Sequence, residues 1–147
     1  MRSIEFHKYS VHLFFIMYTL SILPQTNKHL PYHEEDGALR VSLAMARAGK
    51  PLKRSSLYSA DAHEDGEGNP VCVSSSDLHQ VLEADVGKPK HIASQEVAMS
   101  KCGIVFFEGV PAIKGETGHF DLMKHGLTKQ RDYWSEASNV WLWETKE

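Results

Sequence analysis

Residues 117–122 read TGHFDL, which places a histidine and an aspartate two positions apart in a segment that we expect to be a short strand. A loop containing Pro111 and Gly115 precedes it. Because side chains alternate between the two faces of a strand, His119 and Asp121 should lie on one face of a sheet. An imidazole beside a carboxylate is the base and its orienting group in a nucleophilic hydrolase. The stretch therefore predicts half of a hydrolytic site, whose nucleophile must lie elsewhere, ideally at a helix N-terminus.

The clearest helix signal covers residues 37–49, which read GALRVSLAMARAG. Asp36 is a suitable N-cap, and Gly49 with Pro51 should end the helix. Apolar side chains recur at helical spacing at Ala38, Val41, Met45 and Ala48. One face of this helix is therefore expected to pack closely against a neighbouring sheet or helix.

The remaining elements follow in a simple order. A short strand is expected at residues 71–73, then a helix over 77–83 capped by Ser75 or Ser76, and residues 92–99 form a further short segment with helical character. Three closely spaced strands follow, at residues 103–109, 118–123 and 139–144. Helices first and strands afterwards favour an α+β fold, with N-terminal helices packed on a small antiparallel sheet, over alternating βαβ units.

The composition is that of an ordinary soluble domain. The chain has 147 residues, of which 41% are hydrophobic and 24% charged, and this length suits a single core. The formal charge is −3, and no stripe of lysine and arginine gathers on a predicted face. Both observations argue against a nucleic-acid partner.

No metal or cofactor site is predicted. The nine histidines are scattered; His29 and His33 have helical spacing, but Pro31 between them argues against a helix there. Cys72 and Cys102 cannot form a structural zinc site alone, and they permit at most one disulfide. We expect both to be small buried residues.

The N-terminus has two interpretations. An apolar run over residues 11–23 is too short to span a membrane but has the length of a signal-peptide core. No small-x-small cleavage site follows, since Pro24 begins a turn, and this favours a buried first helix. We therefore divide the chain into an N-terminal segment, residues 1–30, and a domain over residues 31–147.

Four stretches, in order, resemble the type VI secretion amidase effectors of the fourth group. Residues 36–45 (DGALRVSLAM) resemble the catalytic helix, in which a cysteine precedes an Ala-(Leu/Ile)-Arg-x-Ser pattern. Residues 103–107 (GIVFF) resemble the next landmark, and residues 118–122 (GHFDL) resemble the Gly-His-x-Asp-Leu-Trp strand. Residues 135–143 (SEASNVWLW) resemble the closing strand. The order and spacing of the four matches make the resemblance specific.

The resemblance implies an NlpC/P60-type, papain-like fold. It also implies hydrolysis of the bond between D-glutamate and meso-diaminopimelate in bacterial cell-wall peptides. Proteins of this kind are secreted into the periplasm of a rival bacterium, where a cognate immunity protein blocks their site. Neither a cofactor nor a membrane span is implied.

The resemblance also assigns the site residues. His119 takes the place of the catalytic base. Its orienting acid is either Asp121, on the same strand, or Asp132, which lies near the distance at which the family places its acid and is narrowly preferred. The nucleophilic cysteine of the family falls on Gly37, which has no side chain to attack a substrate. Three explanations remain: an inactivated copy, a natural pseudoenzyme, or a shifted register of the match.

Two other functions stay open on the sequence. One is a non-catalytic binding module for cell-wall peptides or for an immunity protein, on the same scaffold. The other is an unrelated α+β interaction domain. Activity of a Gly37→Cys variant separates the first from an inactivated enzyme, and the absence of a cleft between Gly37 and His119 would favour the second.

Overall fold

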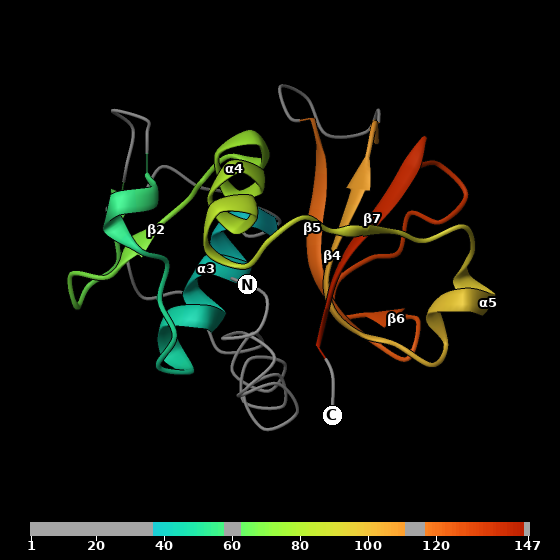
Figure 1. The fold of residues 1–147 in the computed structure, drawn as a ribbon, viewed down its shortest axis with the longest axis horizontal. Coiled ribbons are helices and arrows are strands. Elements are labelled where there is room, and N and C mark those ends of the chain that lie inside the picture. Colours follow the sequence, from blue (N-terminus) through green and yellow to red (C-terminus); the bar gives the residue numbers. More distant parts are fainter. Residues whose placement is uncertain (1–36, 58–62, 111–116, 146–147) are drawn as a thin grey trace.

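The computed structural model describes residues 37–57, 63–110 and 117–145 (Figure 1). The apolar run at residues 11–23, the proposed boundary near residue 30 and the expected cap Asp36 lie outside the described residues. No helix in the described ranges has the length and apolar character needed to cross a membrane. The elements are α3 (Gly37–Arg47), η1 (Arg54–Ser56), β1 (His63–Glu64), β2 (Pro70–Val71), α4 (Ser75–Asp85), β3 (Lys90–His91), α5 (Gln95–Ala98), β4 (Cys102–Glu108), β5 (Gly118–Lys124), β6 (Leu127–Thr128) and β7 (Asn139–Thr145).

Five strands form one antiparallel sheet in the order β3-β7-β4-β5-β6. The three long strands β4, β5 and β7 lie side by side in Figure 1, with α3 and α4 beside β5. A separate two-stranded sheet joins β1 to β2. The predicted α+β fold, with helices packed on an antiparallel sheet, is therefore confirmed.

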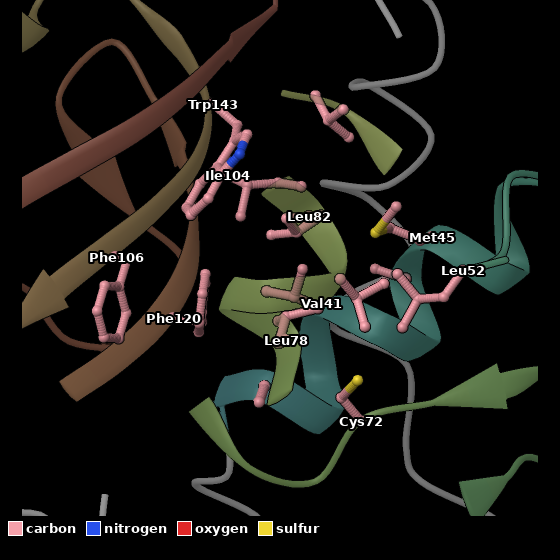
Figure 2. Packing of buried hydrophobic residues seen from close by; sticks show 14 of the residues in the cluster. Val41, Met45, Leu52, Cys72, Leu78, Leu82, Ile104, Phe106, Phe120 and Trp143 are labelled. Atoms are coloured by element: carbon pink, nitrogen blue, oxygen red, sulfur yellow. The ribbon is translucent and has the colours of Figure 1, made fainter. Parts of the chain in front are cut away.

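The sheet separates two apolar clusters. Beneath α3 and α4, Phe106, Phe120 and Trp143 of the sheet pack with side chains of both helices (Figure 2). The opposite face carries a second cluster that includes Phe107 and Leu142. Strand β4 is buried on both faces, because its five central residues are all buried.

Two hydroxyls tie the helices to the rest of the fold. Ser42 of α3 is fully buried, and its Oγ donates to the carbonyl of Ala38 and accepts from the backbone N–H of Cys72 at 3.1 Å. Ser75 of α4 donates to the carbonyl of Gly118 at 2.9 Å. Buried polar groups that are paired in this way hold neighbouring elements in one arrangement.

Some expected boundaries were wrong. The N-cap of α4 is Ser74, whose Oγ accepts from the N–H of Asp77, so it precedes the expected Ser75 or Ser76. The strand expected at residues 71–73 is β2, which ends at Val71. The segment at residues 92–99 contains only the single turn α5. The boundaries of short elements depend on their tertiary contacts more than on the local sequence pattern.

Candidate functional site

Strand β5 brings His119 and Asp121 together. Phe120 and Leu122 point into the cluster under the helices, so the two polar residues face the other side of the sheet. Both are 4% exposed, and His119 Nε2 lies 3.8 Å from Asp121 Oδ2. This distance is suitable for an ion pair but too long for a hydrogen bond.

Two backbone N–H groups hold the Asp121 carboxylate. Oδ1 accepts from Leu122 N at 2.8 Å, and Oδ2 accepts from Gln130 N at 2.8 Å. The second bond comes from the segment that follows β6, so that segment fixes the orientation of the carboxylate. The oxygen nearest His119 is therefore held in place before any substrate binds.

The ring of His119 is held by packing. Tyr133 meets it edge-on, with ring centroids 5.1 Å apart and planes at 61°. In the described part of the chain, His119 Nε2 is buried and has no hydrogen-bond partner. A buried ring nitrogen without a partner is unusual, since such groups are normally paired. It can take a partner only if Asp121, water or a ligand moves closer.

Gly37, the first residue of α3, faces this histidine. An ideal Cβ on Gly37 would lie 3.0 Å from His119 Cε1 and would collide with the carbonyl oxygen of Phe120. Strand β6 pairs with β5 at Met123 and Lys124, further along the strand than His119 and Phe120. A side chain at position 37 would therefore point at the His119 ring, although the backbone leaves no room for it.

The structure does not bring Asp132 to His119. Asp132 is exposed, and within the described residues no ion pair joins it to a histidine, lysine or arginine. The sequence preferred Asp132 narrowly over Asp121. The geometry favours Asp121, because among the described residues its carboxylate is the one that lies beside the imidazole.

The two cysteines are free, and they occupy different environments. Cys72 is buried in the cluster under the helices, and burial, assisted by the charges of Asp77 and Asp85, raises the pKa of its thiol to about 12. Cys102, expected to be buried, is partly exposed. No described contact links either thiol to His119.

Sequence reasoning missed the residues after β6. Gln130 anchors Asp121 through its backbone, and Tyr133 packs on His119. Trp134 packs edge-on against Phe107, with ring centroids 5.4 Å apart. A hydrogen bond from a backbone N–H leaves no signal in the sequence, because nearly every residue can donate it. Aromatic residues in a polar turn do not reveal from the sequence which ring they will contact. Only the run of aromatic residues at positions 133 and 134 hinted that the turn packs inward.

The described residues contain no group of three or more histidine, cysteine, aspartate or glutamate side chains that could hold a metal ion.

The tryptophans divide between core and surface. Trp143 is buried under the helices, and Trp134 and Trp141 are partly exposed.

Comparison with known proteins gives a consistent result. The family model described as Tae4, type VI secretion system (T6SS) amidase effector protein 4, matches residues 33–143. No curated protein matches the chain.

The chain also resembles solved structures. The effector Tae4 from Salmonella typhimurium, in complex with the immunity Tai4 from Enterobacter cloacae, has a TM-score of 0.70 at 17% identity, over 91% of this chain and 96% of that one. The effector Tae4 from Enterobacter cloacae has a TM-score of 0.71 at 16% identity, over 90% and 96%. The Tae4–Tai4 complex from Enterobacter cloacae has a TM-score of 0.67 at 15% identity, over 91% and 96%. At these identities the likeness shows a shared fold.

Proposed function

The chain belongs to the type VI secretion system amidase effector 4 family, and from this membership we propose that it is an antibacterial effector directed at the peptide stems of bacterial peptidoglycan. Residues 31–147 would form the effector domain, and the family match over residues 33–143 supports this boundary. Its place of action would be the periplasm of a target bacterium.

The reaction that fits the site is attack of a nucleophile on a peptide carbonyl. In a papain-like, NlpC/P60-type arrangement, a thiol at the start of a helix loses its proton to a histidine, and an acid orients that histidine. Position 37 at the start of α3, His119 and Asp121 correspond to these three places. The bond between D-glutamate and meso-diaminopimelate is the proposed scissile bond.

This assignment rests on the closeness of position 37 to His119. An ideal Cβ there would lie 3.0 Å from His119 Cε1, so position 37 is next to the proposed base, as the place of a nucleophile must be. Because Gly37 supplies no side chain, we propose that this chain does not cleave its substrate. A Cβ at position 37 would collide with the Phe120 carbonyl. This collision supports the proposal, because it indicates a site whose backbone has adapted to glycine.

A second candidate is a binding module that holds cell-wall peptides without cutting them. The same collision favours it, since a site built around glycine does not regain a nucleophile from one change. Solved Tae4 structures contain the immunity protein Tai4, and we propose that a cognate immunity protein also binds this chain.

The test compares four purified proteins on peptidoglycan stem peptides that contain the D-glutamate–diaminopimelate bond. They are the present chain, Gly37→Cys, Gly37→Ala, and Gly37→Cys combined with His119→Ala. Mass spectrometry detects released diaminopimelate-containing peptides, and circular dichroism establishes folding. Gly37→Ala is the matched control, because it adds the same Cβ without a thiol.

Release by Gly37→Cys alone, lost with His119→Ala, would support an inactivated amidase. If a folded Gly37→Cys protein is silent while the present chain binds stem peptides, the binding module is favoured. A chain that neither cleaves nor binds these peptides would overturn both candidates.

A further inference from the structure

A second pair of reactive side chains lies at the opposite end of strands β4 and β5 from Gly118. Cys102 is the first residue of β4, and His125 directly follows β5. The Sγ atom of Cys102 lies 4.0 Å from both Nδ1 and Nε2 of His125. The thiol is partly exposed and the imidazole is exposed, so both groups are open to a small reagent.

The backbone holds this pair in place. The N–H of His125 donates to the carbonyl of Lys101 at 2.8 Å, and His125 has a positive φ of 52°, a conformation that among residues other than glycine is enriched at asparagine, aspartate and histidine. Thr145 Oγ1 donates to the carbonyl of Cys102 at 3.2 Å. The left-handed backbone conformation at His125 therefore fixes the direction in which its imidazole projects.

By strand register, Lys124 shares the sheet face of Cys102, whereas Lys101 and Glu144 belong to the other face. Lys124 is directly opposite Cys102 in the β4–β5 register, and Lys101 precedes it. Glu144 of β7 pairs with Lys101 at 3.6 Å and with Lys90 at 3.3 Å. A partly exposed thiol beside an imidazole and a lysine is in the kind of environment in which reactive cysteines are found.

We propose that Cys102 and His125 form a thiol-exchange site for small anionic disulfides, separate from the His119 site. His125 takes the proton of the Cys102 thiol, and the thiolate attacks one sulfur of the disulfide. A Cys102–sulfur bond forms as the original sulfur–sulfur bond breaks, and the departing thiolate accepts a proton from the imidazolium or from water. The positive charge of Lys124, opposite Cys102 in the register, favours disulfides that carry carboxylates.

The test follows the reaction of the folded protein with dithiobis-nitrobenzoate, an anionic disulfide whose leaving thiolate absorbs light, and with neutral iodoacetamide. We expect Cys102 alone to react while the protein is folded, and Cys72 to react only after unfolding. Cys102→Ser should abolish the folded-state reaction. Incubation with oxidised glutathione should yield a mixed disulfide at Cys102, located by peptide mass spectrometry.

The decisive variant is His125→Asn, because asparagine tolerates the left-handed backbone but cannot take the proton. It should slow both reagents about tenfold near neutral pH. Lys124→Gln should slow the anionic reagent more than iodoacetamide. His91→Asn, at an exposed histidine that instead packs on Trp141, is the control and should leave both rates unchanged.

Unchanged rates in folded His125→Asn would overturn the proposal, as would a Cys72 that reacts as fast as Cys102. If His125→Asn does not fold, His125→Gly, which also suits a positive φ, replaces it. The result is independent of peptidoglycan cleavage, since none of these residues contacts His119.

Discussion

Gly37 and His119 face each other across the junction of α3 and β5, and an ideal Cβ on the glycine would lie 3.0 Å from Cε1 of the histidine. The same Cβ would collide with the Phe120 carbonyl. Position 37 is thus close enough to His119 for a nucleophile, but the backbone leaves no space there for a side chain. This relationship decides how substitutions at position 37 should behave.

Gly37→Ala should destabilise the protein. In an open helix the change would stabilise by up to about 1 kcal/mol, but here the methyl group must displace backbone, at a cost of about 1–3 kcal/mol. Urea unfolding, with Gln80→Ala on the exposed surface of α4 as the control, measures the difference. A more stable Gly37→Ala protein would show that α3 moves freely away from β5.

Asp121→Asn should cost about 1–3 kcal/mol in the free energy of unfolding. Each carboxylate oxygen accepts one backbone N–H bond, and an amide places its NH₂ group against one of these donors. Asp132→Asn is the matched control and should change stability by less than about 0.5 kcal/mol, because Asp132 is exposed. Equal losses in both variants would argue against Asp121 as the residue that orients His119.

Ser42→Ala should destabilise by about 1–3 kcal/mol, because it leaves the buried N–H of Cys72 without its acceptor. Ser135→Ala is the control, since Ser135 is exposed and, in the described part of the chain, bonds an exposed glutamate. Thermal unfolding of both variants provides the comparison. A Ser42→Ala protein as stable as the control would mean that another acceptor, such as water, replaces the hydroxyl.

Cys72 should make stability depend on alkaline pH. Burial raises the pKa of its thiol from 9.0 to about 12, so the folded state retains a proton that the unfolded state loses. The resulting stabilisation is fully present below pH 9.0 and is lost as the pH rises toward 12, with a slope of at most about 1.4 kcal/mol per pH unit. Denaturant unfolding between these pH values should show a shallower loss for Cys72→Ala than for the unsubstituted chain.

Cys102→Ser is the control for this pH series and should retain the slope of the unsubstituted chain. Lysines and tyrosines also titrate in this range, so the quantity of interest is the difference in slope between variants. Identical slopes for Cys72→Ala and the unsubstituted chain would mean that the Cys72 thiol ionises equally easily in the folded and unfolded states.

The sequence by itself determined the main elements and half of the candidate site. Helical spacing from Ala38 to Ala48 predicted α3, and apolar runs predicted β4 and β7, because these signals are local and persist over several residues. The alternation of a strand was enough to place His119 and Asp121 on one sheet face. The resemblance to the effector family rested on the same stretches.

Only the tertiary structure decided the remainder. The two-residue strands β1, β3 and β6 are too short to carry a periodic pattern, and β3 also depends on β7, a partner distant in the chain. The geometry that favours Asp121 over Asp132 is its closeness to His119, and its carboxylate is held by a backbone N–H of Gln130, a group that all residues except proline possess. The closeness of Gly37 to the Phe120 carbonyl depends on how tightly a helix end packs on a strand edge. Packing at that scale is a property of the assembled fold, so no local pattern encodes it.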